Sequence, residues 1–121
     1  MDNFPFTKRH SDRDIALPRG TDDTAYQNVL ERELPALLDQ VRPELVLYDA
    51  GADVHANDRL GHFELSLEGL YRRDLFVLGQ CRQRDIPVAA VIGGGYDRDL
   101  TALAERHAQL FLAAREIIQP S

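Results

Sequence analysis

Two short segments of this chain carry residue types that catalytic sites use. Residues 51–61 include the carboxylate of Asp58, and the three glycines at 93–95 are followed at once by Tyr96. A carboxylate is a common metal ligand. A phenol with a pKa of about 10 stays protonated at neutral pH, so it can donate a hydrogen bond to a developing oxyanion. The two residue types together suggest a metal ligand and an oxyanion donor.

Each segment directly follows a short apolar run, at residues 45–48 and 88–92. In an open parallel α/β sheet, the groups just beyond the carboxyl ends of the strands line the ligand crevice. If the two runs form neighbouring parallel strands, Asp58 and Tyr96 reach one edge of the sheet and face the same pocket.

Both segments also allow a simpler interpretation. The first segment and its flanks hold five possible donors, and acidic and histidine side chains are common in any polar loop; the five are Asp49, Asp53, His55, Asp58 and His62. Three consecutive glycines permit backbone conformations or close approaches that a Cβ would forbid, and an ordinary strand-to-helix turn would use them as well.

Helical patterns surround the two expected strands. The first begins at residues 21–23 with capping side chains and ends at Arg42-Pro43, and Pro35 inside it should kink or divide the helix. The second begins at Ser66 as N-cap, and a third covers roughly 98–116. Residues 1–20 are expected to form an irregular arm. The order helix, strand, helix, strand, helix predicts parallel strands with a right-handed crossover.

Two strands are few for an all-parallel sheet, which normally has several strands and helices on both faces. The predicted fold class is therefore α/β, as part of a three-layer α/β/α arrangement with parallel strands.

Composition limits the partners and the compartment. The chain has 121 residues and a formal net charge of -6 at pH 7, which argues against a nucleic acid or an anionic membrane as main partner. Cys81 is the only cysteine, which excludes an internal disulfide and fits a reducing cytoplasm. The helical pattern around it predicts a small buried apolar residue.

The two motifs closely resemble the C-terminal part of the histone deacetylase superfamily, which has the arginase/deacetylase fold. The resemblance rests on residues 43–53, Asn57-Asp58-Arg59-Leu60-Gly61 and Gly93-Gly94-Gly95-Tyr96, and it is nearest to class IV and bacterial deacetylase-like members. Residues 4–6, 15–18 and 20–23 look like the family's long loop after its middle zinc-binding strand.

The resemblance implies a role for each matching residue. Asp58 matches the family's last zinc-binding aspartate, and Tyr96 matches the tyrosine that polarises the acyl-lysine carbonyl and stabilises the tetrahedral intermediate. Gly94 and Gly95 match the glycine wall of the acyl-lysine channel. Asp53 is expected behind the metal ligand, as a residue that supports the strand end. The implied substrate of the complete enzyme is acetylated lysine or a small acetyl amide.

Other parts of the family site are missing. The family takes two further zinc ligands from an upstream Asp-x-His motif and its general base from a His-His pair, yet none of the four histidines here is adjacent to another. Asp53-Val54-His55 has the Asp-x-His pattern in the wrong place. We therefore expect a C-terminal portion, spanning 1–121, that lacks tightly bound Zn²⁺ and deacetylase activity on its own.

Two alternatives remain open. The chain is a truncated, non-catalytic α/β domain that acts as an interaction or oligomerisation module, self-associating or binding a missing N-terminal half through exposed apolar surface. Less well supported is an unrelated binding protein with a phosphate-holding glycine turn, because no Lys-Ser/Thr pair follows the glycines.

Overall fold

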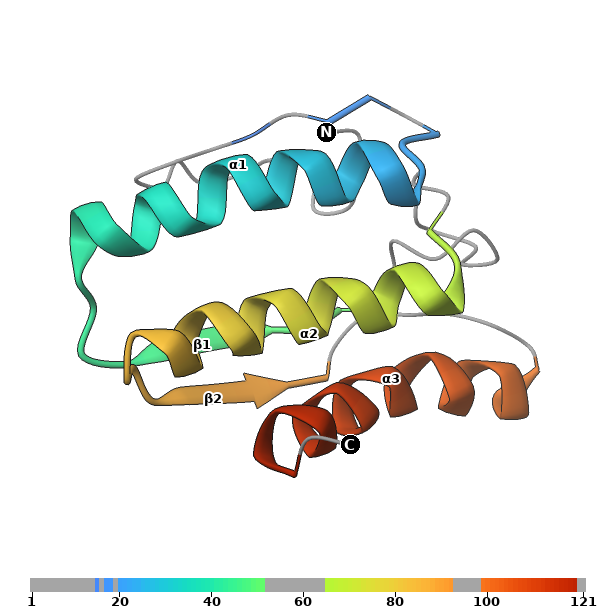
Figure 1. Ribbon diagram of the computed structural model, residues 1–121. Coiled ribbons are helices and arrows are strands. Elements are labelled where there is room, and N and C mark those ends of the chain that lie inside the picture. Colours follow the sequence, from blue (N-terminus) through green and yellow to red (C-terminus); the bar gives the residue numbers. More distant parts are fainter. Residues whose placement is uncertain (1–14, 16, 19, 52–64, 93–98, 120–121) are drawn as a thin grey trace, which may run out of the picture.

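The computed structural model describes residues 15, 17, 18, 20–51, 65–92 and 99–119. Five elements follow one another along the chain: α1 (Asp23–Val41), β1 (Val46–Asp49), α2 (Leu67–Gln83), β2 (Val88–Val91) and α3 (Leu100–Ile118). This order confirms the predicted alternation of helices and strands. Figure 1 shows α1 and α2 running side by side, with β1 behind α2, β2 below it, and α3 on the side of α2 away from α1.

The two strands form a parallel pair, as predicted. Val46 lies opposite Val88 and Asp49 lies opposite Val91, so the strands are in step from their first residue to their last. The connection between them runs through α2. The two carboxyl ends consequently lie next to each other at one edge of the sheet (Figure 1).

Side chains at the N-terminal ends fix where the helices begin. Asp22 caps α1 by accepting a hydrogen bond from the amide of Ala25, and Ser66 caps α2 by accepting one from the amide of Gly69. Asp99 does the same for α3. These side chains satisfy backbone donors that have no partner within the helix. The prediction of Ser66 as an N-cap is confirmed.

Pro35 was predicted to kink or divide the first helix, and the division is wrong. α1 is one element of 19 residues with Pro35 inside it, and it ends where Arg42 adopts the left-handed conformation (φ 51°) before Pro43. α1 is joined to the α2 segment near both of its ends, on either side of the proline. At the far end, Arg84 Nε donates to Asp39 Oδ1 over 2.8 Å.

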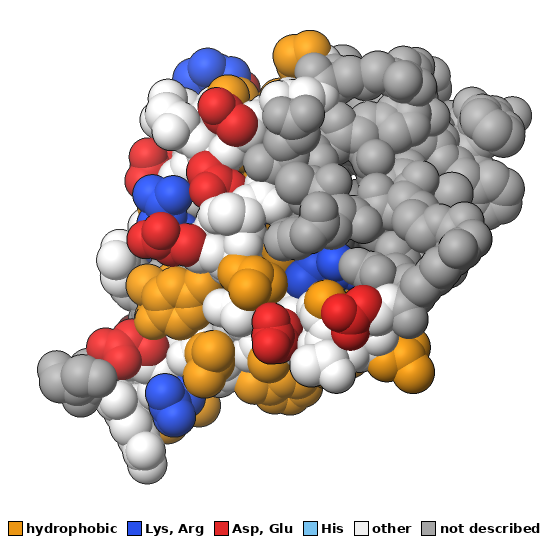
Figure 2. Space-filling model, turned by 90° about the vertical axis from the view of Figure 1, so that its right-hand side faces the viewer, with side chains coloured by type: hydrophobic (Ala, Val, Ile, Leu, Met, Phe, Trp, Pro, Cys, Tyr) orange, Lys and Arg blue, Asp and Glu red, His pale blue; other side chains and the backbone are white. Residues whose placement is uncertain are grey.

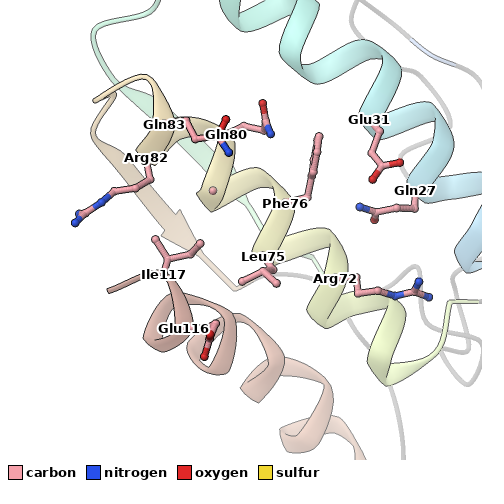
Figure 3. Close-up of a pocket in the computed structure, with 11 residues that line it drawn as sticks. Gln27, Glu31, Arg72, Leu75, Phe76, Gln80, Arg82, Gln83, Glu116 and Ile117 are labelled. Carbon is pink, nitrogen blue, oxygen red and sulfur yellow. The ribbon is translucent and has the colours of Figure 1, made fainter. Parts of the chain in front are cut away.

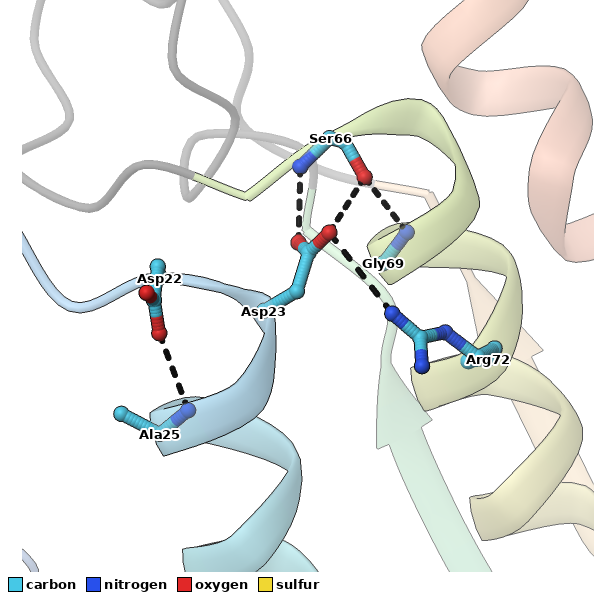
Figure 4. Close-up of polar contacts among 6 residues, drawn as sticks. All are labelled: Asp22, Asp23, Ala25, Ser66, Gly69 and Arg72. Carbon is cyan, nitrogen blue, oxygen red and sulfur yellow. Dashed lines mark hydrogen bonds and ion pairs between the residues drawn. The ribbon is translucent and has the colours of Figure 1, made fainter.

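At the near end, Asp23 joins the first turns of α1 and α2 (Figure 4). Its Oδ1 accepts from the backbone amide of Ser66 at 2.8 Å, and its Oδ2 accepts from the Ser66 hydroxyl at 2.5 Å. A guanidinium nitrogen of Arg72 lies 3.7 Å from the same carboxylate. Because the carboxylate lies at two helix N-termini, it interacts favourably with both helix dipoles.

The main core lies between one face of the sheet and the two later helices. Ala50 at the end of β1, Leu78 of α2 and the α3 residues Leu110 and Ala113 are buried together, with Tyr48 and Val88 packed against them. A smaller cluster of Leu65 and Leu70 lies nearer α1.

None of the described helices covers the other face of the sheet, which exposes apolar side chains. Leu47 is 78% exposed and Val91 is 59% exposed, whereas Tyr48 and Val88 on the covered face are half-buried. The reason is that alternate residues of a strand point to opposite faces, and the described helices α2 and α3 pack on the Tyr48 face. Among the described helices, none is long and apolar enough to cross a membrane.

Candidate functional site

The predicted site residues all lie outside the described part of the structure. Asp53 and Asp58 belong to residues 52–64, and Gly94, Gly95 and Tyr96 belong to residues 93–98. The structure describes the points at which these two segments leave the sheet. The first continues from Gly51 and the second from Ile92.

These two points lie at the same edge of the sheet. The amide of Ala50 donates to the carbonyl of Val91 over 2.8 Å, which extends the strand pairing one residue beyond β1. Ala50 is only 3% exposed, while Asp49 beside it is exposed. Asp49 therefore remains in contact with solvent at the strand end. The geometry expected from the sequence, with both segments starting from one edge, is met as far as Gly51 and Ile92.

A buried polar cluster lies beneath the end of β1. Arg73 and Asp74 of α2 are 5% and 1% exposed, and Arg73 Nε donates to Asp74 Oδ1 at 2.9 Å. The hydroxyl of Tyr48 donates to the same carboxylate oxygen. The other end of the guanidinium reaches the strand end, since Nη1 of Arg73 donates to the carbonyl of Gly51 at 2.6 Å.

The protonation states in this cluster follow from burial and charge. Burial disfavours the charged guanidinium, but contact with Tyr48 and Asp74 outweighs it, so the pKa of Arg73 is raised and the side chain stays charged. Burial, only partly opposed by the charge of Arg73, raises the pKa of Tyr48 well above its ordinary value of 10.0. Tyr48 is therefore a neutral hydrogen-bond donor at physiological pH, and its ring lies 6.0 Å from Cζ of Arg73.

This cluster was not among the residues predicted from the sequence. One indication was available, because Asp74 lies four residues after Leu70 and four before Leu78, on the apolar side of α2. A carboxylate at such a position must be paired when it is buried. The partner could not be read from the pattern, because Tyr48 lies 26 residues away on a strand.

A separate groove of about 620 Å³ lies on the outer side of α2 (Figure 3). Its lining includes Leu75, Phe76 and Gly79 of α2, together with Glu31 of α1 and Ile117 of α3. Phe76 points toward the space between α1 and α2 (Figure 3). None of the described groups below the strand ends lines this groove, so it is distinct from the predicted site.

The described residues provide no metal centre of their own. Across residues 20–51, 65–92 and 99–119, no three His, Cys, Asp or Glu side chains come together in a way that could hold an ion. Cys81 is a buried free thiol whose pKa is raised by burial, which agrees with its predicted place in the core.

Comparison with known proteins assigns the chain to a family. Residues 3–113 match the sequence model of the histone deacetylase domain. This chain belongs to the histone deacetylase family. The family assignment confirms the resemblance inferred from the motifs, and the match extends over both predicted site segments.

Individual relatives agree with the family match. An uncharacterized protein of Picosynechococcus sp. is 49% identical over 115 residues, covering 95% of this chain and 38% of its own length. Histone deacetylase 2 of Arabidopsis thaliana is 32% identical over 77% of this chain and 25% of its own length. This deacetylase-family chain therefore spans well under half of the curated relatives it matches.

A solved structure shows the same fold. The acetylpolyamine aminohydrolase of Burkholderia pseudomallei superposes with a TM-score of 0.69 at 20% identity, over 84% of this chain and 28% of that protein. The predicted fold class, α/β with parallel strands as part of the arginase/deacetylase fold, is confirmed. The described elements correspond to a portion of that fold.

Proposed function

We propose that this chain is the C-terminal part of a zinc-dependent deacetylase that hydrolyses an acetyl-lysine or a related acetyl amide. In this proposal Asp58 is one zinc ligand and Tyr96 is the oxyanion donor. Gly94 and Gly95 line the channel for the acyl chain, and Asp53 supports the loop behind the ligand. The remaining ligands and the general base come from sequence that the chain does not contain.

The observation that carries the proposal is the pairing of β1 with β2. The strands are parallel neighbours that end level, at Asp49 and Val91, so the two motif-bearing segments start from one edge of the sheet. In parallel α/β sheets this edge is where ligands bind. The family match, which spans residues 3–113 and so includes both motifs, supports the same assignment.

A complete zinc site does not fit the residues of this chain. Catalytic zinc usually has three protein ligands and a water, and histone deacetylases are generally zinc-dependent. Here Asp58 is the only residue that the motif match assigns to the metal, and the described residues add no group of three donors. We therefore expect that the isolated chain does not retain zinc.

The chemistry that this chain would supply itself is the hydrogen bond from Tyr96. A neutral phenol directed at the substrate carbonyl stabilises the charge that develops on oxygen during amide hydrolysis. Removing one oxyanion donor costs on the order of 100-fold to 1,000-fold in rate in well-studied hydrolases. Tyr96→Phe should therefore lower kcat by about that factor in a complete enzyme, with a smaller effect on KM.

A hybrid protein tests the proposal. This chain would replace the matching 115-residue region of the Picosynechococcus relative, and the hybrid, the parent and the isolated chain would be compared. We expect zinc in the hybrid and parent, hydrolysis of acetyl-lysine or acetylpolyamine substrates by both, and neither property in the isolated chain. Asp58→Asn should lower the zinc content of the hybrid, while Tyr96→Phe should retain zinc and lose turnover.

Two results would contradict the proposal. One is a folded hybrid, with the circular dichroism and size of the parent, that contains no zinc. The other is chelator-sensitive turnover by the isolated chain, since that would require a full ligand set within these 121 residues. If the hybrid with Asp58→Asn held as much zinc as the unsubstituted hybrid, only the assignment of Asp58 as a zinc ligand would be contradicted.

A second candidate function is that of a non-catalytic oligomerisation module, and the open face of the sheet favours it. Leu47 and Val91 expose apolar surface there, which in a soluble protein usually marks a contact site. If a second copy covers this face, Leu47→Lys should shift the chain toward monomer in light scattering. Leu100→Lys is the matched control, because Leu100 at the start of α3 is 75% exposed and Leu47 78%. A wild-type chain that is already monomeric would exclude this function.

A further inference from the structure

The buried cluster of Tyr48, Arg73 and Asp74 makes contacts that the core alone does not require. α2 already packs against the sheet and α3 through apolar side chains such as Leu78. Burying a guanidinium and a carboxylate has a desolvation penalty, and apolar residues of similar volume often serve a core equally well. A charged pair can, however, form directed hydrogen bonds that an apolar pair cannot form.

Arg73 forms hydrogen bonds to two parts of the fold at once. The guanidinium is planar and presents its donors in a fixed fork. Its Nε is bonded to Asp74 at 2.9 Å and its Nη1 to the carbonyl of Gly51 at 2.6 Å, so it joins a rigid helix to the residue that follows the strand. Tyr48, from within β1, donates to the same carboxylate and fixes its orientation.

Gly51 is the last described residue before the segment that carries Asp53 and Asp58. Its carbonyl accepts the bond from Arg73, while the amide of Ala50 pairs with Val91 of the neighbouring strand. The direction in which the chain leaves the sheet is thus fixed from the helix side and from the strand side. An apolar residue at 73 would leave only the strand contact.

We propose that Arg73, oriented by Asp74 and Tyr48, is a positioning residue that fixes the end of β1 through the Gly51 carbonyl for the segment bearing Asp58. The inference rests on the proposed function in one respect, because Asp58 is the proposed metal ligand. The anchoring of Gly51 itself involves described residues alone.

The first test uses the full chain and backbone amide exchange by NMR. Arg73→Lys keeps the charge beside Asp74 but cannot span both partners, so we expect the Ala50 amide to exchange about tenfold faster with unchanged exchange in α3. Arg72→Lys is the matched control, since Arg72 is the adjacent residue and pairs with Asp23 on the other side of α2. Equal Ala50 exchange in both variants would overturn the anchoring.

A second variant covers the case in which Arg73→Lys does not fold. Tyr48→Phe removes only the hydroxyl that orients Asp74, and we expect the Ala50 amide to be affected in the same direction but less strongly. If Tyr48→Phe leaves the Ala50 amide as protected as in wild type, while Arg73→Lys is unfolded, Arg73 is a structural residue and the inference is wrong.

The link to the site is tested by the zinc dissociation constant of the hybrid. We expect about a tenfold weaker zinc affinity in Arg73→Lys, in line with other outer contacts of metal ligands, and no change in Arg72→Lys. A hybrid that binds zinc equally in both variants contradicts the inference and leaves the proposed function intact. A folded hybrid without zinc contradicts the proposed function, and with it the role of Arg73 toward Asp58.

Discussion

The contact between Asp23 and Gly69 allows a sharp test of how α1 is fixed to α2. A Cβ added to Gly69 would lie 1.9 Å from Oδ1 of Asp23 and 2.5 Å from its Cγ, far closer than two such atoms can come. Gly69→Ala therefore requires the Asp23 carboxylate to move. That movement would break its two hydrogen bonds to Ser66 and lengthen its contact with Arg72 (Figure 4).

The sign of the effect depends on which of two opposing contributions is larger. Replacing a helical glycine by alanine usually stabilises by about 0.5–1 kcal/mol. Losing two hydrogen bonds to a carboxylate costs more, about 2–3 kcal/mol for a partly exposed pair. We therefore expect Gly69→Ala to lower the free energy of unfolding by about 1–2.5 kcal/mol, the difference between these two contributions.

A double-mutant cycle identifies the cause. In the Asp23→Ala background the obstructing carboxylate is gone, so Gly69→Ala should become stabilising by about 0.5–1 kcal/mol. Gly79→Ala is the control in the same helix, since its added Cβ would meet only Ile117 Cδ1 at an ordinary 3.6 Å. Urea denaturation at one protein concentration measures all five proteins. If Gly69→Ala is as stable as Gly79→Ala with Asp23 present, the reasoning is refuted.

Three further predictions follow from burial. Tyr48 has a raised pKa in the folded chain, so its contribution to the free energy of unfolding should be fully present below pH 10.0, the ordinary tyrosine pKa, and should be lost as the pH rises above it. In urea titrations above pH 10.0, the wild type should lose up to about 1.4 kcal/mol per pH unit more than Tyr48→Phe. The Cys81 thiol should react with a disulfide reagent at pH 8 on the order of 100-fold more slowly in the folded than in the urea-unfolded chain, and equal rates would contradict its burial. Leu78→Ala in the core should cost about 2–4 kcal/mol and Leu47→Ala on the open face less than about 0.5 kcal/mol, and similar losses would mean that the face is covered.

Local sequence patterns predicted the helices well because helix ends depend on nearby residues. Ser66 caps α2 through an amide three residues away, and Asp22 does the same for α1. The predicted division of α1 at Pro35 was wrong, since a local pattern carries no information on contacts distant in sequence. Asp23 with Ser66 and Asp39 with Arg84 join α1 to α2 on both sides of the proline.

The strand patterns predicted the sheet but not which of its faces is covered. A short apolar run fits a strand buried on both faces, and here Leu47 and Val91 show that one face is open in the described structure. The family motifs predicted the site residues with their roles, and Asp58 and Tyr96 remain predictions. The Tyr48, Arg73 and Asp74 cluster could not be predicted, because it depends on how α2 packs against β1.

Helix α2 connects every part of the described structure, which explains why its polar residues separate into two groups. Near its start, α2 holds α1 through its N-cap Ser66 and through Arg72, and the adjacent Arg73 and Asp74 hold the end of β1 from the buried side. Hydrophobic side chains gather on the lower part of the surface shown in Figure 2. On α3, Leu100 and Phe111 are among the exposed apolar residues. The α1 contact and the β1 contact thus share one rigid helix but no partner residue. Substitutions at Gly69 should therefore change global stability while leaving the Ala50 amide protected in the folded state, whereas Arg73→Lys should speed exchange of the Ala50 amide and leave exchange in α3 unchanged.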